Sequence, residues 1–156
     1  MLFFVDAMLG NIAKKLRLLG FDSEYFSDID DSEFLERSQN ENRIIISKDQ
    51  NLIKRAEKMN ISFIYISKEN EIEQFQEIHE KIHLEFNESS GDVARCPKCN
   101  FTTSQTKKSE IANKVPEKIL EYHDKFWKCN GCGQIYWEGK HIKNLQEFVG
   151  KIKCLI

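Results

Sequence analysis

LFFVD at residues 2–6 and RIIISKD at residues 43–49 are short apolar runs that each end in an aspartate. Neither run alternates apolar with polar residues, which is typical of strands buried on both faces of a parallel sheet. Because an aspartate follows the first strand directly and the second strand after one residue, these two runs also place a carboxylate at the end of each strand. The two runs therefore predict both the central strands of a sheet and an acidic site at the ends of those strands.

Outward from these runs, strands and helices are predicted to alternate along the first half of the chain. Apolar residues at helical spacing, followed by Gly20, predict a helix over 9–19. The further predicted elements are a short strand at 24–26, a helix from 30 or 31 to 40, a helix at 51–59, a strand at 61–66 and a helix at 71–84. This order predicts an α/β fold in which helices flank a parallel sheet.

The composition is that of a folded protein, with 40% hydrophobic and 31% charged residues among 156. It excludes a disordered chain, and the apolar runs are far shorter than the ~20 residues that span a bilayer. No signal peptide is recognised at the start, so we expect a cytoplasmic protein without a membrane partner. The sequence carries no signal for a particular oligomeric state.

Charge divides the chain into two parts. Residues 1–90 carry 11 basic and 18 acidic side chains, whereas residues 91–156 carry 12 basic and 7 acidic ones. The change falls at a polar, turn-rich stretch, residues 87–92. We therefore predict two domains, 1–88 and 91–150.

Four of the five cysteines form two Cys-x-x-Cys pairs, Cys96 with Cys99 and Cys129 with Cys132, separated by 29 residues. Two thiolates separated by two residues form a turn that presents both sulfurs to one tetrahedral ion. We predict that the four cysteines hold a structural Zn²⁺ in a C-terminal zinc ribbon. The alternatives are reduced structural cysteines or a redox pair, and Cys154 is left as a free thiol.

Aspartates follow predicted strands or open predicted helices at Asp6, at Asp30 and Asp31, and at Asp49. Ligands of such sheets bind beyond the carboxyl ends of the strands, where these side chains can converge. Clustered carboxylates repel one another unless a divalent cation neutralises them, and oxygen ligands suit Mg²⁺ or Mn²⁺. The alternative is that Asp30, Asp31 and Asp49 are simply helix caps.

The chain resembles the Mut-seven C-terminal RNase domain family, a PIN-like nuclease domain fused to a zinc ribbon, over roughly residues 1–150. The matching stretches in the first half are FVDAMLG at 4–10, LRLLGFD at 16–22, Asp30-Asp31 with Leu35, and RIIISKD at 43–49. Those in the second half are RCPKCN at 95–100, VP at 115–116, FWKC at 126–129 and CGQIYWEGKH at 132–141.

The resemblance implies a PIN-like fold whose acidic cluster binds Mg²⁺ or Mn²⁺ and hydrolyses RNA phosphodiester bonds. Asp6, Asp31 and Asp49 match the acidic positions of the family, and Asp30 precedes one of them and either assists it or substitutes for it. Ser47-Lys48-Asp49 stands where the family more often has Thr-Arg-Asp. A full PIN site has a fourth acid, to which the resemblance assigns no residue here.

Basic residues are predicted to contact RNA in both halves. Lys14, Arg17 and Lys48 are the predicted substrate contacts, although the first two can also belong to a solvated helix face. In the second half, lysines interleave with aromatic residues, so cations can follow phosphates while aromatics stack on unpaired bases. The alternative is that Trp127 and Trp137 form the small core of the ribbon.

These observations favour a metal-dependent ribonuclease with a zinc ribbon that supports RNA binding. A non-catalytic RNA- or ribosome-associated binding protein with a PIN-like fold is the alternative. A toxin-type nuclease neutralised by a partner is a third hypothesis, against which the zinc ribbon weighs.

Overall fold

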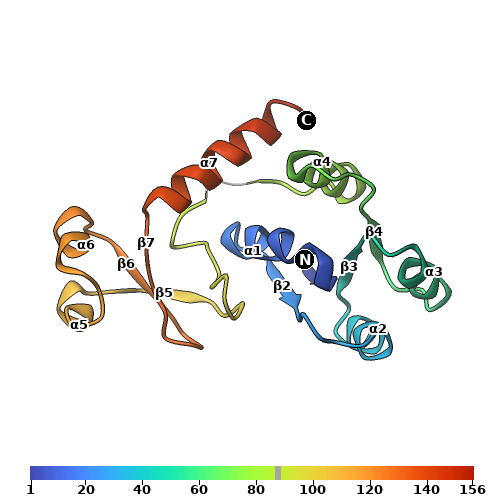
Figure 1. The fold of residues 1–156 in the computed structure, drawn as a ribbon, viewed down its shortest axis with the longest axis horizontal. Coiled ribbons are helices and arrows are strands. Elements are labelled where there is room, and N and C mark those ends of the chain that lie inside the picture. The colour runs from blue at the N-terminus through green and yellow to red at the C-terminus, as the bar shows by residue number, and fades with distance from the viewer. Residues whose placement is uncertain (87–88) are drawn as a thin grey trace.

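The computed structural model describes residues 1–86 and 89–156 of the chain (Figure 1). The predicted boundary at 87–92 thus includes two residues, 87–88, that lie outside the described part. Among the described helices, none combines the length and the apolar character needed to cross a membrane.

The first half forms the predicted parallel sheet. Its strands are β1 (Leu2–Val5), β2 (Asp22–Tyr25), β3 (Ile44–Ser47) and β4 (Phe63–Tyr65). They lie in the order β2-β1-β3-β4, and every neighbouring pair is parallel. The 3-10 turn η1 (Ala7–Leu9) leads into α1 (Gly10–Leu18), and the other helices are α2 (Asp31–Asn40), α3 (Gln50–Lys58) and α4 (Glu71–Ile82). The predicted α/β fold is confirmed.

Helices cover both faces of this sheet because successive residues of a strand point to opposite sides. On one face, Phe3 and Val5 of β1 share a core with α1, α4 and a C-terminal helix, α7 (Lys140–Lys153). On the other face, Phe4 packs with α2 and α3. The sheet is therefore buried on both sides, as its unbroken apolar strands indicate.

The strand order changes direction between β1 and β3. From β1 the chain passes to β2 on one side, and it then returns to β3 on the other side. Ligands of open α/β sheets bind beyond the strand ends at such a switch point. Asp6 follows β1 and Asp49 follows β3 after one residue, so two neighbouring strands deliver carboxylates to this place.

The second half contains a small antiparallel sheet. Its strands are β5 (Thr103–Thr106), β6 (Phe126–Cys129) and β7 (Ile135–Trp137), in that order. Two short helices, α5 (Lys108–Ile111) and α6 (Glu117–Tyr122), lie between β5 and β6. They account for the long spacer between the two cysteine pairs, and Ile111 and Phe126 are buried in the core they form with the sheet.

Helix α7 packs with the first half of the chain, although it follows the second in sequence. Leu145 and Ile152 are buried in the same core as α4, and Figure 1 shows α7 running from the small sheet back to α4. The division into domains 1–88 and 91–150 remains a prediction. By packing, we define the N-terminal unit as residues 1–86 and the ribbon as residues 91–139, with α7 packed on the former.

Polar side chains fix the ribbon against β2, the edge strand of the parallel sheet. Asn100, which has a positive φ of 68°, accepts a hydrogen bond from the Ser23 N–H (3.0 Å) and donates one to Asp22 (2.9 Å). Arg95 forms an ion pair with the same Asp22 at 3.0 Å. The ribbon thus covers an edge that would otherwise expose unpaired backbone groups.

Candidate functional site

The four cysteines lie together at one end of the ribbon. Their sulfur atoms all lie within 4.8 Å of one another. The Cys99 and Cys129 sulfurs are 3.3 Å apart, and those of Cys96 and Cys132 are 3.7 Å apart. Sulfurs around a tetrahedral Zn²⁺ with bonds of about 2.3 Å are about 3.8 Å apart, so the donor set fits zinc. A zinc ion held by four sulfur ligands has no open coordination position, which is the arrangement of structural zinc sites.

Backbone N–H groups favour the thiolate form of Cys129. The N–H groups of Gly131 and Cys132 lie 3.3 and 3.4 Å from its sulfur. Burial by itself raises the pKa of Cys129, but hydrogen bonds from these N–H groups and from the Cys99 and Cys132 side chains outweigh it and bring the pKa down to about 7. Because zinc binds thiolates, the lowered pKa of Cys129 favours metal binding at this cysteine.

Asp6 lies at the switch point of the parallel sheet and is half-buried. Its N–H donates to the Ile46 carbonyl at 2.9 Å, which extends the pairing of β1 with β3. Its Oδ2 accepts a hydrogen bond of 2.6 Å from the Ser47 hydroxyl, and the same hydroxyl oxygen accepts one of 2.9 Å from the Asp49 N–H. The fully buried Ser47 therefore connects two of the predicted acidic positions.

Two of the predicted acids cap helices. Asp49 Oδ1 accepts hydrogen bonds from two N–H groups of the first turn of α3, at 2.8 and 3.2 Å. Asp30 Oδ1 does the same at the start of α2, at 2.9 and 3.0 Å. Each cap uses one carboxylate oxygen, which leaves the second oxygen for another ligand. The capping alternative from the sequence is thus present, and it does not exclude a metal role.

Asp31 is exposed at the first residue of α2 and lies 3.5 Å from Arg55 of α3. Within residues 1–86 and 89–156, the cysteines are the one group of three or more His, Cys, Asp or Glu whose ligand atoms lie within 4.8 Å of one another. The structure thus joins Asp6 and Asp49 through Ser47 and holds Asp31 in an ion pair. A divalent ion shared by the three aspartates stays a prediction. We call Asp6, Asp30, Asp31 and Asp49 the acidic edge.

Two glutamates that follow β4 lie near the same strand ends, and the sequence reasoning did not assign them. Glu69 forms an ion pair of 2.7 Å with Lys48, and Glu71 forms one of 2.8 Å with Lys15. Both glutamates line a cleft of about 440 Å³, together with Lys14, Lys48 and residues that follow β1. The signal that would have found them is the one used for the aspartates, namely an acid shortly after a buried strand.

The predicted substrate contacts differ in their surroundings. Lys14 and Lys48 line the cleft. Arg17, in contrast, is only 5% exposed, and its guanidinium donates to the carbonyls of Ser23 and Pro97, both at 2.8 Å. Arg17 therefore holds α1 to β2 and to the ribbon, and its expected contact with substrate is corrected to a structural role.

The ribbon tryptophans pack in the interior. Trp127 is 2% exposed and its indole N–H donates to Asp92 at 2.9 Å. Trp137 is half-buried and packs near the Phe126 ring, with centroids 6.4 Å apart. Trp137 packs against the ribbon core that contains Phe126, whereas Trp127 is buried outside that core. The alternative in which the tryptophans form the core of the ribbon is therefore supported for Trp137, and Trp127 is a buried residue next to it.

The fold and the sites together define a class of protein: an α/β unit with carboxylates at the ends of a parallel sheet, joined to a four-cysteine ribbon. The chain belongs to the Mut7-C RNAse domain family, whose model matches residues 1–149. The match covers both parts of the chain, confirms the resemblance seen in the sequence and indicates a nuclease-like, RNA-related role. Searches of curated proteins and of solved structures gave no match.

Proposed function

We propose that the protein is a divalent-metal-dependent ribonuclease that hydrolyses RNA phosphodiester bonds at the acidic edge. The observation that carries this proposal is the connection of Asp6 and Asp49 through Ser47 at the switch point of the sheet. Membership of the Mut7-C RNAse domain family supports it. In the proposal the ribbon supports RNA binding.

The carboxylates of the acidic edge are hard oxygen donors that suit Mg²⁺ or Mn²⁺. Asp6 and Asp49 would hold the ion, with Asp31 as the third ligand and Asp30 beside it. Such an ion supplies an activated water and neutralises charge on the phosphate. The hydroxyl of Ser47 fixes one oxygen of Asp6, so the other oxygen keeps a defined direction.

The cations of the cleft suit the phosphates of the substrate. Lys48 lies in the cleft, paired with Glu69, whose side chain is 91% exposed and so lies largely in solvent. Lys14 lines the same cleft from helix α1 and is exposed. In the proposal both lysines contact RNA phosphates, and Glu69 or Glu71 supplies the fourth acid of the site.

The test replaces Asp6 with Asn, which keeps the shape of the side chain but removes its charge. With zinc-loaded full-length protein, a labelled single-stranded RNA and added Mn²⁺, we expect Asp6→Asn to reduce cleavage by about 100-fold or more. The free energy of unfolding without Mn²⁺ should not fall, since the change relieves carboxylate repulsion.

The matched control is Asp28→Asn, an exposed aspartate outside the acidic edge, which should cleave as the unmodified protein does. The metal-free control omits Mn²⁺ from the reaction. It does not use a strong chelator, because a chelator would also remove the zinc. Mn²⁺-dependent cleavage that persists in Asp6→Asn would refute the catalytic assignment.

A non-catalytic RNA-binding protein is the second candidate function. The observation in its favour is that two acids cap helices and Asp31 pairs with Arg55. This function predicts RNA binding that is unchanged by Asp6→Asn, with no cleavage at any Mn²⁺ concentration.

A further inference from the structure

A second cavity, of about 450 Å³, lies between the ribbon and helix α1. Its walls come from Trp127 and Tyr136 of the ribbon sheet, Leu18 of α1 and the first turn of α7. This volume falls within the range of about 300–1,000 Å³ that is typical of pockets for small ligands. The cavity is lined by residues other than the carboxylates of the acidic edge.

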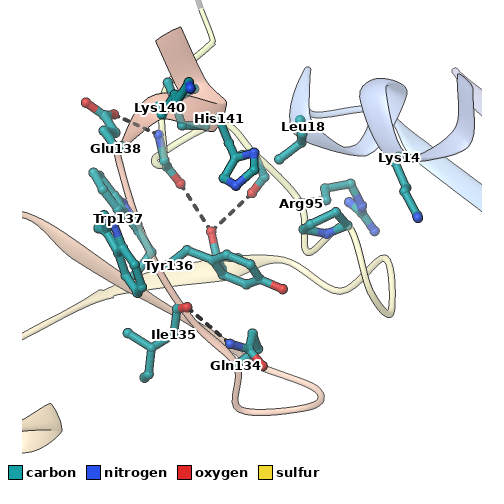
Figure 2. A pocket seen from close by; sticks show the side chains of 17 residues that line it. Lys14, Leu18, Arg95, Gln134, Ile135, Tyr136, Trp137, Glu138, Lys140 and His141 are labelled. Carbon is teal, nitrogen blue, oxygen red and sulfur yellow. Dashed lines mark hydrogen bonds between the residues drawn. The ribbon is translucent and has the colours of Figure 1, made fainter. Parts of the chain in front are cut away.

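Aromatic rings face this space. Figure 2 shows Tyr136 and His141 pointing into the gap between β7 and α1, with Arg95 beside them and Lys14 and Leu18 opposite. Tyr136 is half-buried, and it is supported by Trp127, its cross-strand partner in the β6–β7 register. A fixed flat ring at the wall of an open cavity is a surface on which an unpaired base can stack.

The rim of the cavity is positively charged. Lys14 and Lys140 are exposed and form no ion pair with any residue that the structure describes. Arg95 is already paired with Asp22, so its charge is largely compensated. Glu138, the acidic residue of the lining, accepts a hydrogen bond from a backbone N–H at 3.1 Å. Two unpaired cations next to aromatic walls match the phosphate and the base of a nucleotide.

Shared lining residues connect the cavity with the cleft, which is itself lined by Ala7 and Lys48, the sequence neighbours of Asp6 and Asp49. A third hollow, of about 470 Å³, shares Asn11 and Lys14 with the cleft, and it shares Lys14 and His141 with the cavity. From Asn11 to Leu18, helix α1 rises about 10 Å. The outer side of α1 therefore forms a track from the proposed cleavage site to the ribbon.

We propose that this cavity holds an unpaired base of a single-stranded RNA that runs along α1 from the acidic edge. Tyr136 and His141 stack on the base, and Lys14 and Lys140 contact the neighbouring phosphates. The proposal rests on RNA being the ligand in the proposed function, and it assigns to the ribbon a defined subsite.

Stacking is tested at His141, which is exposed, so its replacement should leave the fold intact. The probe is a single-stranded RNA of about ten nucleotides, within the size range of single-strand sites. It carries 2-aminopurine at one position at a time, and no Mn²⁺ is added. We expect the fluorescence of 2-aminopurine to be quenched on binding at one position of the RNA only. We also expect RNA binding to be about 10-fold weaker in His141→Ala than in His141→Phe, which keeps a flat ring.

Charge is tested by comparing Lys140→Ala with Lys143→Ala, two exposed lysines of the same helix. Lys140 lines the cavity, whereas Lys143 lines none of the three hollows. Lys140→Ala should weaken RNA binding and should reduce the slope of the logarithm of the binding constant against the logarithm of the salt concentration by about one. Lys143→Ala should change neither quantity. The zinc content of every variant is measured, so that loss of the ribbon is recognised.

The outcomes separate this proposal from the ribonuclease. If His141→Ala binds as His141→Phe does, or if the two lysine variants behave alike, the cavity does not hold a base, even when Asp6→Asn abolishes cleavage. If these variants lose binding as expected but Mn²⁺ produces no cleavage, the base subsite is supported and the ribonuclease is refuted. Absence of RNA binding by the unmodified protein overturns both.

Discussion

The cysteine cluster and the acidic edge both draw on residues that are far apart in the sequence, but they are organised differently. The four sulfurs lie within 4.8 Å of one another. At the acidic edge, Asp30 and Asp49 cap helices, Asp31 pairs with Arg55, and Asp6 accepts from Ser47. The ribbon presents a gathered metal site, whereas the acidic edge presents separately anchored carboxylates.

The difference follows from the chemistry of the two ligand types. A thiol is a weak hydrogen-bonding group, so few local partners compete with the turn that gathers the sulfurs. A carboxylate is a strong acceptor that helix N-termini attract, and several carboxylates repel one another when no cation is present. Spacing alone therefore predicts a zinc site well, but it predicts a carboxylate site only in combination with the sheet topology.

The largest expected effect is that of Cys129→Ser on the ribbon. Zinc contributes about 10–16 kcal/mol of apparent binding free energy in small zinc modules, so loss of one ligand should release the metal and unfold β5–β7. Because α7 packs with α4, its amide hydrogens should stay protected. Hydrogen exchange with zinc analysis measures both, and exchange of α7 together with β5–β7 would show that the two units share one cooperative core.

A smaller effect is expected for Asp49→Asn, which tests whether capping and metal binding can be separated. Asn caps helices about as well as Asp, so the free energy of unfolding should stay within about 0.5 kcal/mol. Cleavage should fall about 100-fold, since the ion loses a charged ligand.

Asp49→Ala is the matched variant, because it removes the cap as well and should cost about 1 kcal/mol of stability. Denaturant unfolding and cleavage rates distinguish the two substitutions. Full activity in Asp49→Asn would leave Asp49 as a cap alone.

Asp22→Asn should destabilise the protein by about 2–3 kcal/mol, because the buried Arg43 loses one of its charged partners within the N-terminal unit and Arg95 of the ribbon loses its partner across the contact between the units. Burial by itself raises the pKa of Asp22, but hydrogen bonds from Arg43 and Asn100 outweigh it and hold the pKa below the ordinary 3.8. The stabilisation is therefore present above the ordinary pKa and is lost as the pH falls through the lowered pKa.

Urea unfolding at a series of pH values measures this difference. The difference in the free energy of unfolding between the unmodified protein and Asp22→Asn should be constant near neutral pH and should disappear at acid pH. A gap that does not depend on pH would mean that the charge of Asp22 contributes nothing.

The smallest effects concern Asp30. Asp30→Ala should cost about 1 kcal/mol through loss of the α2 cap, whereas Asp30→Asn should leave the free energy of unfolding unchanged. We expect Asp30→Asn to reduce cleavage less than Asp49→Asn does, because Asp30 assists the site rather than forming its centre. A loss as large as that of Asp49→Asn would place Asp30 among the principal ligands.

Individual elements show how far the sequence predicted the fold. The strand predicted at 24–26 is observed at Asp22–Tyr25. The prediction missed Asp22 and Ser23 because Asp and Ser have low strand propensity. They are in the strand because they pair with β1 in the sheet. The helix predicted over 9–19 is observed at Gly10–Leu18, and the 3-10 turn η1 at Ala7–Leu9 precedes it. The helix predicted from 30 or 31 to 40 is observed at Asp31–Asn40, since Asp30 gives a strong capping signal.

The parallel α/β sheet and the four-cysteine cluster could be predicted from the sequence, because strand and helix periodicity and the Cys-x-x-Cys turn are local patterns. The contacts between distant segments became visible only in the folded structure. Arg17 is buried against Pro97, 80 residues away, and Ser47 connects to Asp6, 41 residues away. Such contacts depend on how helices and strands pack against one another once they have formed. A sequence pattern within a single segment does not predict this packing.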